Sequence, residues 1–425
     1  NVSGLITSRE LSGEIISRNS FNFEDNNVLN FSFVHTVDRS VEIEFFSIID
    51  LRIPYAAVMA IYESEESVSM VHNYSRNHSL IEIEDQKCHL AGEETCWFIS
   101  ESSRLQLNSF KGVFHNGHVK IPNYQAKLVV TQSGCDDFVI DFEVPQISAY
   151  ATHIFDLNKI IDSADVSIKS GAVWFRISFK SFSSFPRLLL TEESKNGEFQ
   201  VTHSDIDYEK VGTDFVYNSM GHTKIPHVLK TLYSSLLEVD PGVPTESKLY
   251  YLDSNGVEKD IDNGAVIKVR DQDGVAFGER EGKLPSRIHT AITGYFSSKN
   301  NVPFRSCLGV VHKNRPTKHT HWVPFKPGLN STLHITDYRE YYKQLGPSIE
   351  LNFKLFNSSN NTIIEKKIEF TSIEIIPNQI KVSEIFDEKS YLSLDSKEFA
   401  YLLINSNYGG FFMFMSLCDN KSFTI

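Results

Sequence analysis

The sequence lacks the motifs that identify most enzymes. It contains no G-x-S-x-G elbow, no Walker loop, no G-x-G-x-x-G following a strand pattern and no H-E-x-x-H pair. Each of these motifs fixes a nucleophile, a phosphate or a metal in a defined geometry, so their absence weakens an enzyme interpretation. Ser, His and Asp are nevertheless plentiful, and a triad assembled from distant residues stays open. The sequence leaves catalysis undecided and assigns no catalytic residue.

Cysteine is scarce and scattered. The five cysteines form no C-x-x-C pair, so neither a zinc ribbon nor a thioredoxin-type site is supported. Cys88 and Cys96 alone lie close enough in sequence for a bridge to be considered. The odd count favours a reducing compartment slightly. Localisation is left open between the cytoplasm and secretion.

Long apolar runs and an excess of basic charge are also missing. The longest apolar stretches, such as GFFMFMSL at 410–417, have the length of a strand and are far shorter than a membrane helix requires. The formal net charge is −13, whereas nucleic-acid binders usually carry a basic footprint. We therefore expect a soluble protein with no membrane span and no nucleic-acid partner.

What the sequence does contain is aromatic and strand-like. It has 31 Phe and 17 Tyr among 425 residues, and strand-length runs recur between Asn-Gly and Asp-Gly turns. Alternating long helices are missing, which argues against a doubly wound α/β fold. The pattern predicts an all-β fold of two tandem, related β-sandwich units of the jelly-roll or immunoglobulin-like kind.

The expectation of two units comes from an internal duplication. Residues 124–162 read as strand, polar turn, strand and short apolar segment, and residues 348–388 repeat that pattern. We expect a first unit over 1–210, a connecting segment over 211–300 and the remainder of the second unit over 301–425. Within the connecting segment, apolar residues at helical spacing followed by Asp-Pro-Gly predict one amphipathic helix over 226–238.

A shorter pattern joins three histidines. Segments starting at Pro54, Pro186 and Pro303 each read as strand, polar turn and strand, and end at His72, His203 and His319 respectively. Their length predicts β-hairpins with a histidine at the end of the returning strand. A fourth such segment, over 399–418, lacks the proline and has Ser416 in place of the histidine.

His319 and His321 form the strongest candidate for a metal site. On a strand, residues i and i+2 face the same side, so both imidazoles would present to one surface. His72 and His203 could join them if the strand ends gathered, giving a transition-metal site for Zn or Fe. Against this, no carboxylate follows before Asp337, and basic neighbours would repel a cation. The competing interpretation, which describes the commoner role, is that histidine and hydroxyl residues simply cap the ends of strands.

Trp97 and Trp322 are the candidate ligand-binding aromatics. Indole rings form stacking platforms for sugars in many β-sandwich modules. The favoured function is therefore a non-catalytic binding or assembly protein, with carbohydrate or another protein as partner. The first alternative is a metal-dependent enzyme with a histidine-ligated site at strand ends. The second is a structural repeat protein that self-assembles into oligomers through its sheet edges.

Overall fold

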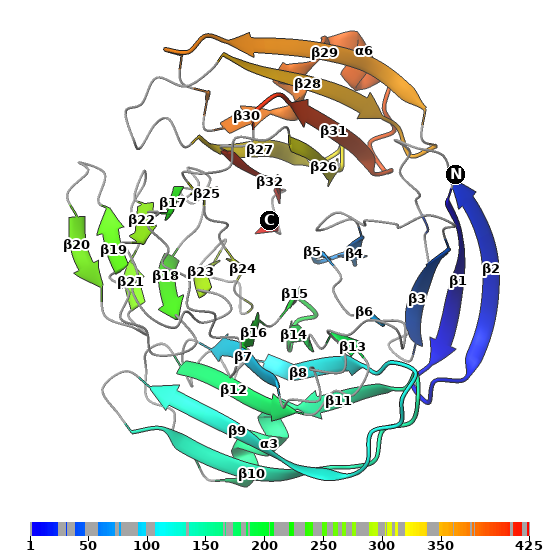
Figure 1. Cartoon of the computed structure of the whole chain (residues 1–425), viewed down its shortest axis with the longest axis vertical. Helices are drawn as coiled ribbons and strands as arrows, with labels where there is room; N and C mark the ends of the chain where they lie inside the picture. Colours follow the sequence, from blue (N-terminus) through cyan, green and yellow to red (C-terminus); the bar gives the residue numbers. More distant parts are fainter. Residues whose placement is uncertain are drawn as a thin grey trace. The chain divides into compact units, whose positions relative to one another are not determined.

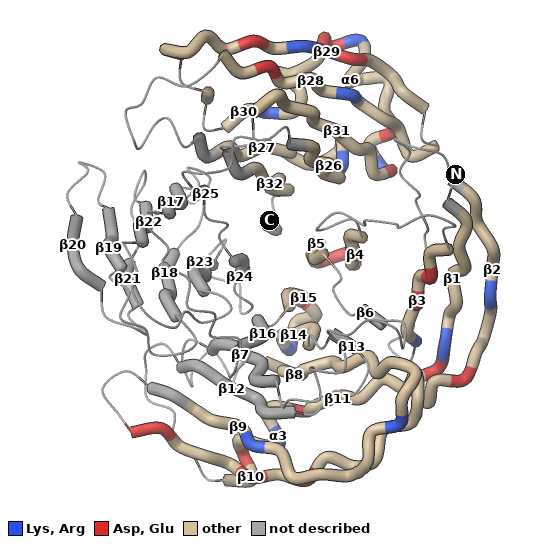
Figure 2. Tube along the Cα trace, viewed as in Figure 1, with Lys and Arg blue, Asp and Glu red and all other residues tan. Residues whose placement is uncertain are grey.

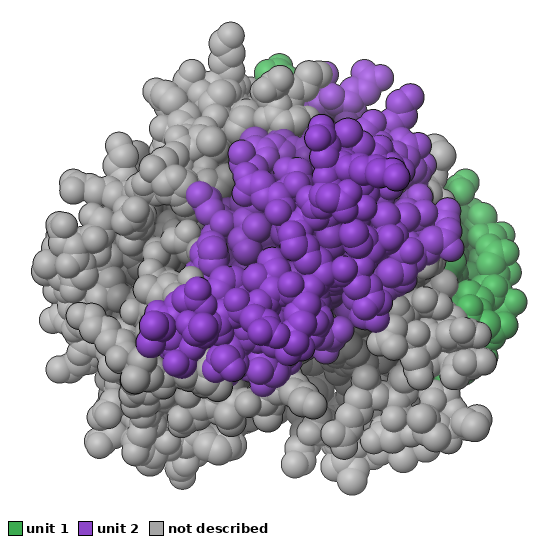
Figure 3. All heavy atoms as spheres, turned by 90° about the horizontal axis from the view of Figure 1, so that it is seen from above, with its two compact units in different colours: residues 1–63, 69–212, 285–288 green, residues 64–68, 213–284, 289–425 purple. Residues whose placement is uncertain are grey.

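The chain divides into two compact units, which are described one at a time (Figure 3). Unit 1 comprises residues 1–63, 69–212 and 285–288, and unit 2 comprises 64–68, 213–284 and 289–425. The computed structural model describes residues 2–23, 31, 39–46, 58–72, 76–77, 92–98, 107–132, 136–164, 166, 173–179, 184–185, 188–203, 205–207, 221–224, 234–240, 249–252, 258–261, 266–268, 274–277, 289–295, 302, 304–307, 311–312, 319–337, 348–359, 361–374, 376–377, 379–408, 411–418 and 423–424.

The described residues are mostly β-strand, which confirms the all-β prediction. Three short helices complete this part of the chain: α3 (Leu157–Ser163), α5 (Val382–Ile385) and α6 (Glu388–Leu392). Over the same residues, no helix has the length and apolar character needed to cross a membrane.

Unit 1 starts with a three-stranded antiparallel sheet in the order β2-β1-β3, followed by a separate β4-β5 hairpin (Figure 1). These strands are β1 (Val2–Glu10), β2 (Ile15–Phe23), β3 (Arg39–Phe46), β4 (Met59–Glu63) and β5 (Val68–His72). The short strand β6 (Arg76–Asn77) pairs with β13 (Ser184–Phe185).

Two larger sheets follow in unit 1, in the orders β10-β9-β12-β7-β16 and β11-β8-β14-β15. Their strands are β7 (Gly92–Phe98), β8 (Leu107–His115), β9 (Tyr124–Gln132), β10 (Phe138–Val144), β11 (Thr152–Asp156), β12 (Val173–Phe179), β14 (Leu188–Ser194), β15 (Phe199–His203) and β16 (Asp205–Asp207). Alternate residues of β8 and β9 are apolar and buried, which explains why these segments form strands. Phe110 and Phe114 are buried on one face of β8, and Leu128 and Val130 on one face of β9.

Unit 2 contains a similar pair of sheets in the orders β20-β19-β22-β17-β25 and β21-β18-β23-β24. The strands are β17 (Gly221–Lys224), β18 (Ser234–Asp240), β19 (Leu249–Leu252), β20 (Glu258–Ile261), β21 (Val266–Lys268), β22 (Gly274–Phe277), β23 (His289–Tyr295), β24 (Phe304–Cys307) and β25 (Val311–His312). The helix predicted over 226–238 is wrong from residue 234 onward, where the chain is β18, and its first residues lie outside the described ones.

A second pair of sheets in unit 2 has the orders β26-β31-β28-β29 and β30-β27-β32-β33. The strands are β26 (His319–Phe325), β27 (Asn330–Asp337), β28 (Ile349–Phe356), β29 (Thr362–Phe370), β30 (Gln379–Lys381), β31 (Ala400–Ser406), β32 (Phe411–Cys418) and β33 (Phe423–Thr424). Strand β28 alternates strictly, with Ile349, Leu351, Phe353 and Leu355 all buried.

One hydrophobic cluster joins these last two sheets. Phe353 of β28 and Leu402 of β31 contribute to it from the first sheet, Leu333 of β27 and Met415 of β32 from the second, and Val382 from α5. These two sheets and α5 therefore share one buried core. Figure 2 shows charged residues along β28 and the edge strand β29. There, the three ion pairs Lys354–Glu365, Lys367–Glu350 and Lys367–Glu369 lie largely in solvent.

Strand pairing confirms two of the predicted hairpins and contradicts the third. β4 pairs with β5, and β14 pairs with β15 in antiparallel register. The third segment does not fold back on itself, because β24 pairs with β23 whereas β26 pairs with β31 in a different sheet. The fourth segment is not a hairpin either, because its strands β31 and β32 belong to different sheets. His319 is consequently the first residue of a sheet strand and does not end a hairpin.

Candidate histidine site

His72 and His203, two of the four predicted metal ligands, meet in unit 1. His72 is the last residue of β5 and His203 the last residue of β15. Their Nε2 atoms lie 2.9 Å apart, and the ring centroids are 4.4 Å apart with an interplanar angle of 52°. His203 is buried and His72 half-buried. At that distance one neutral ring donates its Nε2–H to the Nε2 lone pair of the other.

Ser69 holds the strand of His72 against the strand of His203. Its hydroxyl donates to the carbonyl oxygen of Val201 and accepts from the Val201 amide, at 2.9 Å in both cases. β15 is the last strand of its sheet, so a side chain here satisfies backbone groups at the sheet edge. Ser69 has no exposed surface. Three polar contacts, two from Ser69 and one from His72, therefore hold β5 beside β15.

The surroundings of the pair are apolar. Val71, Leu189 and Val201 form a buried cluster, against which Tyr62 and Phe199 pack. Burial raises the pKa of the Tyr62 hydroxyl above its usual value. This apolar cluster includes residues of both strands that carry the histidine pair.

The other two predicted ligands lie in unit 2. His319 and His321 are two residues apart on β26, where they pair with Ser406 and Ile404 of β31. His321 is half-buried. Across the described residues, no three His, Cys, Asp or Glu side chains form a group able to hold a metal. A site that unites all four histidines stays a prediction.

The two predicted ligand-binding tryptophans lie on different strands, Trp97 on β7 and Trp322 on β26. Trp97 on β7 is directly opposite Trp174 of β12. Trp322 on β26 is half-buried, and its ring centroid lies 6.3 Å from that of Tyr401 at an interplanar angle of 45°. Burial, reinforced by the charge of Glu398, raises the pKa of Tyr401 to about 12. Trp322 thus presents only part of its indole ring.

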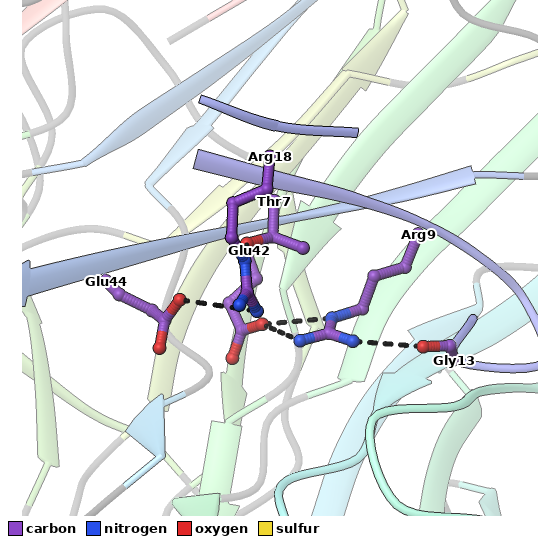
Figure 4. A network of polar contacts seen from close by, with 6 residues as sticks. All are labelled: Thr7, Arg9, Gly13, Arg18, Glu42 and Glu44. Carbon is purple, nitrogen blue, oxygen red and sulfur yellow. Dashed lines mark hydrogen bonds and ion pairs between the residues drawn. The ribbon is translucent and has the colours of Figure 1, made fainter. Parts of the chain in front are cut away.

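A polar network around Arg9 has no counterpart in the sequence predictions (Figure 4). The Arg9 guanidinium donates twice to Oε2 of Glu42, at 3.0 and 2.7 Å, and once to the carbonyl oxygen of Gly13 at 3.0 Å. It also lies 4.3 Å from the centroid of the Tyr150 ring. Arg9 is only 6% exposed. The turn after β1 is thereby tied to β3, which is a structural role.

Two further histidines are also used structurally. His115 Nδ1 lies 2.8 Å from the hydroxyl of Thr152, and burial lowers the pKa of His115 to about 4. His334 Nε2 lies 2.8 Å from the hydroxyl of Ser416, and both residues are buried. Strand alternation places His115 and His334 on the faces opposite the core residues Phe114 and Leu333, so it does not indicate their burial, and their hydroxyl partners come from strands distant in sequence. No known family model matches the sequence, and no curated protein matches it.

Proposed function

We propose that the chain is a non-catalytic binding or assembly protein built from tandem β-sandwich modules, with carbohydrate as the ligand. The observation that carries the proposal is one strand order that recurs three times. The order β10-β9-β12-β7 has the counterparts β20-β19-β22-β17 and β29-β28-β31-β26. The order β11-β8-β14-β15 has the counterparts β21-β18-β23-β24 and β30-β27-β32-β33. Residues 92–207, 221–312 and 319–424 would each be one module.

The first strands of the chain support the same interpretation. The order β2-β1-β3 corresponds to β10-β9-β12, and the β4-β5 hairpin corresponds to β14-β15. The first unit expected from the sequence, 1–210, would then contain more than one set of equivalent strands, whereas 301–425 would contain one complete module and the last strands of the module before it. Tandem modules of this kind present loops at both ends of each sandwich, where binding residues are commonly found.

The use of buried polar groups favours binding over catalysis. Arg9 bridges β3 and a turn, Ser69 satisfies the edge of β15, and His334 contacts Ser416 within unit 2. Each is engaged in holding strands together, and a general acid or base must instead be free to reach a substrate.

Carbohydrate is the proposed ligand because Trp322 keeps an accessible part of its indole ring beside Tyr401. The test is a glycan array probed with the full chain in the presence of a chelator, followed by recovery of the bound glycan. We expect saturable binding to an unaltered glycan, weakened about tenfold by Trp322→Ala. Trp322→Phe, which keeps an aromatic face, should retain most of the affinity.

Three results would count against the proposal. These are binding to no glycan, equal binding by Trp322→Ala, and recovery of a chemically altered ligand. Concentration-dependent oligomers without glycan binding would favour self-assembly through sheet edges.

A further inference from the structure

We propose that His72 and His203 form a two-histidine site for Cu²⁺ or Ni²⁺ that clips the β4-β5 hairpin to β15. The site is independent of the carbohydrate role, because it requires no catalysis and no sugar. Its basis is the convergence of two Nε2 atoms, 2.9 Å apart, from strands separated by 131 residues in sequence.

The separation of the two nitrogens indicates the class of metal. Metal–imidazole bonds are about 2.0–2.1 Å long, so two such bonds ending 2.9 Å apart enclose an angle of about 90°. That is the angle between neighbouring ligands in square-planar and octahedral coordination, which Cu²⁺ and Ni²⁺ adopt with nitrogen and oxygen ligands. Tetrahedral Zn²⁺ would require a separation of about 3.3 Å. The geometry therefore favours Cu²⁺ and Ni²⁺ over Zn²⁺.

The local structure holds both ligands before any metal arrives. The Ser69 hydroxyl fixes the register of β5 by donating one hydrogen bond to the Val201 carbonyl oxygen and accepting one from the Val201 amide, each 2.9 Å long. Ser69 lies three residues before His72, and Val201 lies two residues before His203. The apolar residues Val71, Leu189 and Val201 form a buried cluster on β5, β14 and β15 that holds these strands together. A preformed pair of this kind loses little side-chain entropy on binding.

Binding also has a simple proton balance. In the metal-free pair, one ring carries its proton on Nε2 and donates it to the other. For both Nε2 atoms to bind a cation, that ring moves its proton to Nδ1, and no proton leaves the neutral pair. The metal then replaces the shared hydrogen bond with two coordinate bonds.

The part of the chain that the structure describes supplies two ligands, and we propose that water or small anions take further positions. Among the described residues no third His, Cys, Asp or Glu completes a group with the pair. Two-ligand sites bind more weakly than full protein cages, and their preference follows the general order in which Cu²⁺ exceeds Ni²⁺.

The test is titration of the metal-free full chain with Cu²⁺, followed by electron paramagnetic resonance and by thermal unfolding. We expect one Cu²⁺ per chain with two imidazole nitrogens in the spectrum and a raised melting temperature. His72→Gln and His203→Gln should each weaken binding by about tenfold or more. These replacements retain a hydrogen-bonding side chain, and circular dichroism checks that the variants remain folded.

Two control variants separate this site from other histidines. His153→Gln changes a half-buried histidine of the same unit that contacts Phe155, and it should leave Cu²⁺ binding unchanged. The double variant His319→Gln/His321→Gln changes the pair on β26 and should also bind normally. Loss of copper in that double variant, retention in both single variants of the site, or a spectrum without two nitrogens overturns the proposal. Glycan binding is measured on the same samples, so failure of the two proposals is distinguishable.

Discussion

At the scale of single residues, the Arg9–Glu42 ion pair is the interaction whose loss should matter most in unit 1. The side chain of Arg9 is 7% exposed and that of Glu42 20% exposed, so removing one partner leaves a largely buried charge. Arg9 also donates to the carbonyl oxygen of Gly13 (Figure 4) and lies over the ring of Tyr150.

We therefore expect Arg9→Ala to lower the free energy of unfolding of unit 1 by about 3 kcal/mol. Arg18→Ala is the matched control, because the Arg18–Glu44 pair is 3.9 Å long and considerably more exposed. Its loss should change the free energy by less than about 1 kcal/mol. Urea denaturation of both variants provides the comparison, and equal destabilisation would show that the burial of Arg9 adds nothing.

At the scale of elements, two glycine turns make a second comparison. Gly13 lies between β1 and β2 with φ +95°, and an added Cβ would lie 2.7 Å from the carbonyl oxygen of Ala149. Gly197 lies between β14 and β15 with φ +84°, and an added Cβ would meet nothing within 4 Å. Both positions strain an L-residue, but only Gly13 also adds a collision with backbone.

Gly13→Ala should accordingly destabilise unit 1 by about 3 kcal/mol, the sum of conformational strain and displacement of the neighbouring backbone. Gly197→Ala should lower the free energy of unfolding by about 1 kcal/mol, because this substitution adds conformational strain alone. The two values follow from chemical denaturation of the full chain under identical conditions. A Gly197→Ala variant as unstable as Gly13→Ala would contradict the assignment of the difference to close approach.

Individual strands were predictable from sequence because their information is local. The alternation of Ile349, Leu351 and Phe353 in β28 is visible directly, and so are the β4-β5 and β14-β15 hairpins. The helix expected over 226–238 failed because Leu236 and Leu237 lie in β18, which pairs with β21 on one side and β23 on the other. Backbone hydrogen bonds to a neighbouring strand on each side of β18 outweigh the helical spacing of its apolar residues.

Pairing partners were not predictable, because they depend on contacts far along the chain. The sequence indicated that His72 and His203 end strands, but their meeting requires β5 to lie beside β15. Segment 399–418 reads as a hairpin from its turn, although β31 and β32 pair in different sheets. The Arg9–Glu42 ion pair joins β1 to β3, and no sequence motif predicts this pairing.

At the scale of the whole molecule, each compact unit has a buried cluster of its own. Val71, Leu189 and Val201 belong to unit 1, whereas the cluster around Leu351 and Leu402 belongs to unit 2. Domains with separate cores commonly unfold in separate transitions, so a single melting temperature would not describe the chain.

Differential scanning calorimetry of the full chain should therefore resolve two transitions that respond to different substitutions. Arg9→Ala should lower only the transition of unit 1. Leu351→Ala removes a side chain with no exposed surface and should lower only the transition of unit 2, by the equivalent of about 2–5 kcal/mol. Copper should raise only the transition that Arg9→Ala lowers, because both histidines of the proposed site lie in unit 1. One transition that shifts with both substitutions would mean that the two cores unfold as a single cooperative body.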